Sequence, residues 1–412
     1  MKKPINIGVG KDKNDPISAL EESLDDGGIT DPDIVFVSFT PNLDPNEVRK
    51  DIVSQIDVDE TLVLGVSSAG NLTGDGYTRG AAVLTMKLTQ LVVVGVGMAR
   101  DASENPREKA SEAVRRSTRG VKRDISAALA PAATGIVKGG AMDVVRHSMA
   151  DVLLLVSGVL GDPWGPREIL LGVLDEVMST VPRIVGGVAA NEYDFEAPTY
   201  VFDAEGVHED AVTVLSVFTS LRRGYAVDHG FQPVGEPVKV ETEGTLVKRI
   251  EGKPALEYYA EVIGTSPESI DETILLTHPL GVPDPGPREY VIIRTPIGVE
   301  GDSIRLVSPL KSNFAHLMTR GDVRGSFERS VRAALESAGG EASLVFLFNC
   351  AARHLVVDSD EAIDIVTDVV GEDTPVFGFN CYGEFGPTPS GSIMHHNQTV
   401  TVYVVGRGVM GH

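Results

Sequence analysis

Residues 378–387 read Gly378-Phe379-Asn380-Cys381-Tyr382-Gly383-Glu384-Phe385-Gly386-Pro387. They close the last of three stretches that share one order: a short apolar strand, a helix, and a second strand that ends in glycine. The first strands are residues 34–38, 152–157 and 344–349, and the second strands run into Gly65, Gly187 and Gly378. Such self-similarity predicts that one structural unit is built three times.

The helices of these copies carry start signals. Asp44-Pro45-Asn46-Glu47 is typical of a helix start, because Asp44 can cap the helix and Pro45 suits its first turn. Asp162-Pro163-Trp164-Gly165 opens the second helix similarly, and the third is expected from about Ser359. A strand, a crossover helix and another strand describe a βαβ unit. We therefore predict an α/β fold of layered mixed sheets built from repeated strand–helix–strand units, although α/β proteins without internal repeats show the same order.

Composition excludes several classes of protein. The chain has 412 residues, 42% of them hydrophobic, which favours two or three domains. Its formal charge of −23 disfavours binding to nucleic acid or to an anionic membrane. Cys350 and Cys381 are its only cysteines, so no disulfide framework is expected. The N-terminus lacks the apolar run of a signal peptide, and the longest apolar stretches are shorter than the ~20 residues that span a bilayer. A cytoplasmic protein is therefore expected.

Several motifs along the chain resemble those of the FIST-domain family, whose members carry paired N- and C-terminal modules in sensory and signalling proteins. Their order and spacing extend the resemblance over nearly the whole chain. The motifs are Asp33-Ile34-Val35-Phe36 and residues 65–70, 184–187, 229–235, 251–256, 348–353, 378–386 and 396–399.

The resemblance implies a FIST N-terminal module over residues 1–224, a connecting strand–strand–helix segment over 225–264 and a FIST C-terminal module over 265–412. It also implies a stand-alone intracellular sensor that binds a small molecule and signals through a separate output protein.

Two positions depart from the family pattern, since Ala352 stands where a glycine is usual and Asn71 where a glutamate is common. The sequence leaves open whether the chain forms a homodimer.

The third copy supplies the candidate binding residues. In a parallel sheet, ligands bind beyond the carboxyl ends of the strands, so polar residues that follow its two strands should converge. The planar guanidinium of Arg353 suits a carboxylate, and Glu384 could accept an ammonium group. This pair fits a free amino acid, the ligand class that the resemblance implies; an Arg353–Glu384 ion pair without a ligand is the alternative. The full set of candidates is Arg353, Glu384, Tyr382, Cys350, Asn349, Asn380, Gly383 and His396.

Two other functions stay open at this point. A hydrolase or transferase would use Cys350 or Ser67 as its nucleophile, and His354 is the histidine closest in sequence to Cys350. A haem-based gas sensor would ligate the iron through His396. No metal site and no cofactor other than haem is predicted, and a binding protein is favoured over an enzyme.

Overall fold

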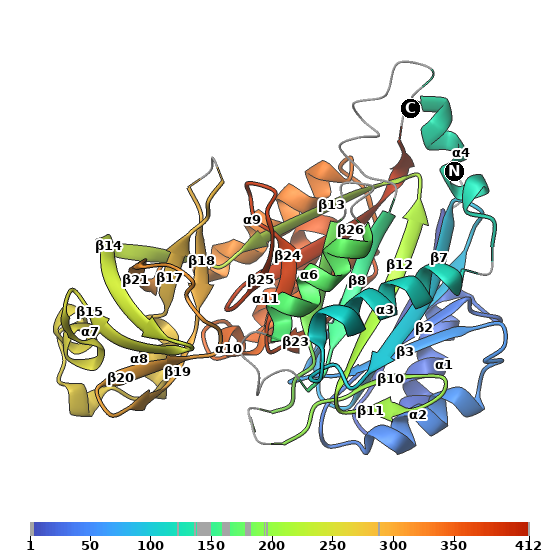
Figure 1. The fold of residues 1–412 in the computed structure, drawn as a ribbon. Helices are drawn as coiled ribbons and strands as arrows, with labels where there is room; N and C mark the ends of the chain where they lie inside the picture. The colour runs from blue at the N-terminus through green and yellow to red at the C-terminus, as the bar shows by residue number, and fades with distance from the viewer. Residues whose placement is uncertain are drawn as a thin grey trace.

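The computed structural model describes residues 4–121, 123–135, 137, 150–158, 165–177, 183–192, 194, 197–286 and 289–410. The chain is an α/β protein in which three similar units surround a shared core, and a lobe is inserted into the third unit (Figure 1). Each unit has the order strand, helix, strand, helix, strand, hairpin, strand. This confirms the predicted fold class, and it adds to each copy an opening strand and helix that lie outside the three predicted stretches.

The first unit consists of β1 (Ile5–Asp12), α1 (Pro16–Gly27), β2 (Ile34–Phe39), α2 (Pro45–Ser54), β3 (Leu62–Ser67), β4 (Asn71–Thr73), β5 (Gly76–Thr78) and β6 (Ala81–Leu88). Asp44 caps α2 as predicted, because its Oδ1 accepts hydrogen bonds from the N–H groups of Asn46 and Glu47 at 2.9 and 3.0 Å. β2 is buried along its whole length, as its β-branched and aromatic residues predict.

The second unit consists of β7 (Val92–Arg100), α3 (Pro106–Arg119), α4 (Ile125–Gly135), β8 (Ala150–Val156), α6 (Gly165–Val177), β9 (Arg183–Val188), β10 (Val201–Asp203), β11 (Val207–His208) and β12 (Ala211–Thr219). The predicted helix start at residues 162–164 lies outside the described residues, and α6 is described from Gly165 onward.

The third unit consists of β13 (Leu221–Asp228), α9 (Val323–Ser337), β22 (Ala342–Cys350), α10 (Ala351–His354), α11 (Ser359–Val370), β23 (Val376–Cys381), β24 (Glu384–Pro387), β25 (Ile393–His396) and β26 (Val400–Val409). α11 begins at Ser359, as the sequence predicts, and Asp358 caps it by accepting a hydrogen bond from the N–H of Asp360 at 2.9 Å.

The units exchange their hairpins in a closed cycle. In the sheet of each unit two neighbouring strands of that unit run parallel, and a hairpin from another unit pairs beside them. The hairpin of the first unit completes the sheet of the third, that of the second completes the first, and that of the third completes the second. The three strand orders are β1-β6-β2-β3-β10-β11, β25-β24-β9-β8-β12-β7 and β13-β26-β22-β23-β4-β5.

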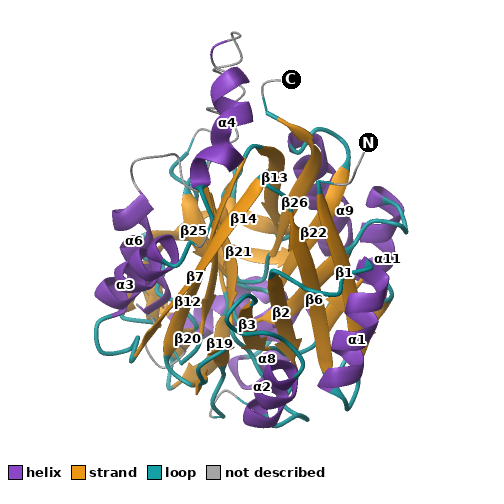
Figure 2. Cartoon of the chain, turned by 90° about the vertical axis from the view of Figure 1, so that its right-hand side faces the viewer, coloured by secondary structure: helices purple, strands orange, loops and turns teal. Residues whose placement is uncertain are grey.

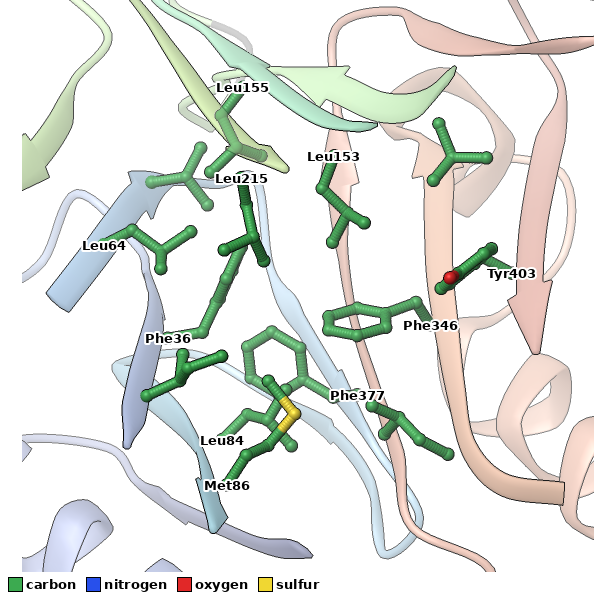
Figure 3. Close-up of a cluster of buried hydrophobic side chains, with 14 of the residues drawn as sticks. Phe36, Leu64, Leu84, Met86, Leu153, Leu155, Leu215, Phe346, Phe377 and Tyr403 are labelled. Atoms are coloured by element: carbon green, nitrogen blue, oxygen red, sulfur yellow. The ribbon is translucent and has the colours of Figure 1, made fainter. Parts of the chain in front are cut away.

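The inner faces of these sheets meet in one apolar core, while helices lie on their outer sides (Figure 2). Phe36 of the first unit packs against Phe377 and Phe346 of the third, with ring centroids 5.2 and 6.0 Å apart. Leu153 and Leu215 of the second unit complete this contact (Figure 3). Removal of this apolar surface from water is the main force that holds the units together.

A buried ion pair also joins the second and third units. Nε of Arg223 on β13 lies 2.7 Å from Oδ2 of Asp151 on β8, and both side chains are fully buried. The hydroxyl of Tyr403 on β26 donates to the same carboxylate oxygen at 2.6 Å. These charge-assisted contacts satisfy an acid that burial would otherwise penalise.

The inserted lobe, residues 231–320, projects from the body of the molecule (Figure 1). It is an antiparallel sheet with its own apolar core, and it extends over most of the predicted connecting segment and beyond it. Its elements are β14 (Phe231–Glu243), β15 (Leu246–Ile250), β16 (Lys253–Pro254), α7 (Ala255–Ile263), a 3₁₀ turn (Pro267–Ser269), α8 (Glu272–Thr277), β17 (Leu280–Pro283), β18 (Val291–Arg294), β19 (Pro296–Glu300), β20 (Ser303–Leu306) and β21 (Phe314–Arg320). Among the helices described here and above, none has the length and apolarity needed to cross a membrane.

Candidate functional site

The carboxyl ends of β22 and β23 meet where the sequence predicts them to. The two strands are parallel neighbours, and their last register pairs are Asn349 with Asn380 and Cys350 with Cys381. The loops that follow them therefore start side by side, which is the usual location of a binding site in a parallel sheet.

A cavity of about 230 Å³ lies at this position, between the third unit and the lobe; we name it the Cys350 cavity. Its walls are mostly apolar, as in most small-molecule sites. The exposed side chains of Ile297 and Leu355 mark its open side. The body contributes Cys350, Ala351, Ala352, Leu355, Tyr382 and Asn397, and the lobe contributes Glu272, Leu276, Thr295, Pro296, Ile297 and Val307.

Two buried polar atoms of this lining lack a hydrogen-bond partner among the described residues. They are Oγ1 of Thr295, which is 4% exposed, and Oδ1 of Asn397, which is 2% exposed. The side-chain nitrogen of Asn397 donates to the backbone oxygen of His396 at 3.1 Å, so the side-chain oxygen is the atom without a partner. Because unsatisfied buried polar atoms cost about 1–3 kcal/mol each, they indicate where a ligand's donor groups would be stabilised.

Arg353 does not line this cavity. Its Nε donates to Oδ1 of Asn349 at 3.0 Å, and its guanidinium stacks 4.6 Å from the ring centroid of Phe327. The remaining four N–H groups are engaged by the backbone oxygens of His229, Gln398 and Val323 and by the hydroxyl of Ser326. A guanidinium has five donors, and all five have partners here. A ligand carboxylate could bind it only by displacing one of them, so the structure favours a positioning role for Arg353 over the predicted clamp.

Asn349 and Asn380 also lie behind the cavity wall. The amide of Asn349 donates to Oδ1 of Asn380 at 2.7 Å, which extends the chain of hydrogen bonds from Arg353 across both strand ends. Gly383 contributes backbone only, and its carbonyl accepts from the N–H of Val188 at 2.9 Å. A side chain at Gly383 would collide with His395, whose Nε2 lies 2.2 Å from the Cβ position. These residues hold the strand ends in place.

Glu384 is fully buried and makes no ion pair with Arg353 among the described contacts. Its Oε2 accepts from the hydroxyl and the N–H of Thr399 at 2.7 and 3.2 Å, and its Oε1 accepts from the thiol of Cys381 at 3.4 Å. Burial raises the pKa of this carboxyl to about 8, since desolvation outweighs the hydrogen bonds. Glu384 is therefore mostly protonated at neutral pH, and the alternative of a structural Arg353–Glu384 ion pair is not what the structure shows.

The candidate nucleophiles lack activating partners in the described part of the chain. Burial raises the pKa of the Cys350 thiol, which keeps it protonated at neutral pH. His354 stacks on Tyr77 with a centroid distance of 5.2 Å, and its Nδ1 lies 2.9 Å from the hydroxyl of Ser359. The hydroxyl of Ser67 accepts from the N–H of Tyr200 at 2.8 Å and is buried. This arrangement contains no nucleophile–base pair of the kind that such enzymes need.

His396 is fully buried, and its Nε2 lies 3.0 Å from the backbone oxygen of Gly386. Burial lowers the pKa of this imidazole to about 3. Tyr290 packs on its edge, with ring centroids 6.3 Å apart, so a porphyrin could reach the histidine only if these groups moved apart. Over the ranges described, no cluster of His, Cys, Asp or Glu has the geometry of a metal site.

Sequence reasoning found two cavity-lining residues, Cys350 and Tyr382, and missed the rest. Asn397 lies within the motif at residues 396–399, which the resemblance used without assigning it a role. Thr295 and Glu272 come from the lobe, and no local pattern in the sequence shows that these segments face the end of β22.

Comparison with known proteins identifies both modules. A family model for the FIST N domain matches residues 33–253, and one for the FIST C domain matches residues 255–387. No curated protein matches the chain. The crystal structure of cyanuric acid hydrolase from A. caulinodans matches over 98% of this chain and 99% of that chain, with 9% identity and a TM-score of 0.39, a similarity too low to carry an argument. The two domain matches cover most of the sequence, and the protein therefore belongs to the FIST family of sensory, small-ligand-binding signal-transduction proteins.

Proposed function

We propose that this protein is a sensor that binds a small metabolite with an amino group, such as an amino acid, in the Cys350 cavity. One observation carries the proposal: Thr295 and Asn397, each with a buried oxygen that lacks a hydrogen-bond partner among the described residues, line a mostly apolar cavity. An amino group donates up to three hydrogen bonds and would satisfy both oxygens. The carboxylate of Glu272, also in the lining, adds a favourable charge for an ammonium group.

The rest of the lining suits the body of such a ligand. Leu276, Ile297 and Val307 offer apolar contacts to an aliphatic side chain. No arginine or lysine is among the described lining residues, so these residues do not neutralise the carboxylate of an amino acid. We therefore expect the amine to contribute more to affinity than the carboxylate, which faces the open side of the cavity.

The position of the cavity suggests how binding produces a signal. A ligand held between the body and the lobe contacts both, so it favours the arrangement in which the two are docked. Such a ligand shifts the equilibrium toward this state by its differential affinity, and a separate output protein could read the shift.

Thermal unfolding with single compounds tests the proposal. We expect stabilisation by leucine and by its decarboxylated amine, and none by the matching acid without the amino group. A ligand at 100 times its dissociation constant adds about 2.7 kcal/mol. No stabilisation by any amine would refute the proposal, a Soret band in the purified protein would favour the haem sensor, and turnover of a substrate would favour the enzyme.

The variant Thr295→Val tests the site itself. It removes the unsatisfied hydroxyl while keeping the shape of the side chain, so the free protein should be at least as stable as the wild type. Ligand affinity should fall about 3- to 10-fold, the equivalent of one hydrogen bond. Thr367→Val on α11 removes a hydroxyl that bonds to the backbone of its own helix and serves as the matched control. Normal binding by Thr295→Val would place the ligand elsewhere.

A further inference from the structure

A second cavity, of about 580 Å³, lies between α6 and the lobe, against the edge strand β25. It shares no lining residue with the Cys350 cavity. The second unit, the third unit and the lobe all contribute to its walls, and α6 and β25 lie close together in Figure 1. We name it the cationic cavity for its three basic residues, Arg167, Arg294 and Lys311.

The charge of this lining is unusual for the protein. Among the described residues no aspartate or glutamate lines it, although the chain as a whole carries a formal charge of −23. Arg167 is half exposed and pairs with Glu168 at 2.9 Å, which neutralises part of its charge. The cavity therefore concentrates positive charge in a strongly acidic molecule, and an anion is the complementary ligand.

Arg294 is the strongest indication of an anion. Its Nε and Nη1 donate to the backbone oxygens of Pro309, Ile293 and His395 at 3.3, 2.8 and 3.2 Å. The described residues give it no carboxylate partner and give its Nη2 no acceptor. Burial lowers the pKa of this guanidinium to about 10, with no acid nearby to offset the cost. Arg294 is only partly exposed and has no counter-charge among the described residues, so a bound carboxylate would stabilise its charge.

The remaining walls are mostly apolar, apart from Ser308, Ser312 and His395. Leucines from α6 face the lobe across the cavity, and the lobe and β25 supply further aliphatic side chains and a methionine. These residues are Leu170, Leu171, Leu174, Val282, Ile292, Leu310, Ile393 and Met394. An inorganic anion would leave this surface uncovered, whereas an aliphatic chain would bury it at about 25 cal/mol per Å².

We propose that the cationic cavity binds an amphipathic organic anion, with its carboxylate on Arg294 and Lys311 and its aliphatic chain against α6. This site goes beyond the proposed amine site in the Cys350 cavity. It binds an anion rather than a cation, and it lies between α6 and the lobe. A ligand bound there would contact all three neighbouring parts of the chain.

Isothermal titration calorimetry with octanoate tests the proposal on the full chain. We expect octanoate to bind, octylamine not to bind, and octan-1-ol and inorganic phosphate to bind at least tenfold more weakly. Added salt should weaken octanoate binding, because part of the attraction is electrostatic. Absence of octanoate binding would overturn the proposal, and equal binding of octanol or phosphate would overturn the combined recognition of charge and chain.

Three variants locate the site. Arg294→Gln should weaken octanoate binding tenfold or more, the size expected for a charge-assisted hydrogen bond. Lys311→Gly removes a charge at a residue whose φ of 51° suits glycine, so it should fold even if the first variant does not. Leu174→Glu places an acid in the wall and should abolish binding. Lys50→Ala, remote on α2, is the charge-matched control, and unchanged binding in Lys311→Gly and Leu174→Glu would refute the location.

Discussion

Glu384 should make the stability of the protein fall as the pH rises from 4.5 to 8. Its pKa is raised from 4.5 to about 8 because the carboxyl is fully buried. Below pH 4.5 it is protonated in both the folded and the unfolded chain and contributes no pH dependence. Between the two values the unfolded chain loses this proton while the folded chain keeps it, which favours unfolding.

The size of the effect follows from the shift. Each pH unit in this window lowers the free energy of unfolding by about 1.4 kcal/mol, so the whole window amounts to about 5 kcal/mol. That is a large part of the 5–15 kcal/mol by which domains are typically stable. Glu384→Gln replaces the carboxyl with an amide that does not titrate, and it should remove this contribution.

Urea unfolding of the wild type and of Glu384→Gln, measured from pH 4.5 to 8.5, gives the comparison. The wild type should lose about 5 kcal/mol relative to the variant across the range, and the difference should level off above pH 8. Glu372→Gln removes an exposed carboxylate and controls for the change in net charge. If the curves of the wild type and Glu384→Gln run parallel, the carboxyl is ionised in the fold and the reasoning from burial is wrong.

Three further changes test other parts of the structure. Asp151→Ala should lower the free energy of unfolding by about 3–5 kcal/mol in urea titrations, because it leaves Arg223 buried without its counter-charge, whereas Asp175→Ala removes only an exposed pair. Arg353→Met should destabilise the fold through five lost hydrogen bonds. A variant that keeps its melting temperature and its binding of the decarboxylated amine but loses leucine binding would restore the carboxylate clamp. Alkylation of Cys350 by iodoacetamide should be slow at pH 7, accelerate with pH and be slowed by a bound amine; fast labelling at pH 7 would contradict the raised thiol pKa.

The sequence predicted the local elements well because their signals are local. A run of β-branched and aromatic residues predicts strand β2, and the cap at Asp44 predicts the start of α2. The convergence of Cys350 and Tyr382 also followed, because parallel strands end at one edge of a sheet. Each of these inferences needs only a few neighbouring residues or one topological rule.

What the sequence did not predict depends on contacts between distant segments. The role of Arg353 turns on three backbone oxygens, from His229, Val323 and Gln398, and no pattern in the sequence places these around a guanidinium. The lobe wall of the Cys350 cavity, with Thr295, is set by how an inserted sheet docks on the body. The sequence did not predict the hairpin exchange either, because β4 pairs with a strand some three hundred residues away, with Leu72 opposite Gly378.

That exchange has a consequence for how the chain reaches its native state. Because the hairpin of β4 and β5 cannot dock on the third unit until β23 has been synthesised, nearly the entire polypeptide must be made before this hairpin reaches its sheet. Pairings so distant along the chain slow folding and leave unpaired strand edges that invite aggregation. A fragment that stops at the end of β12 would lack the hairpin that completes the second sheet and every strand of the third unit beside which β4 pairs. Expression of the N-terminal module alone should therefore yield an aggregation-prone, incompletely folded product rather than a small, stable domain.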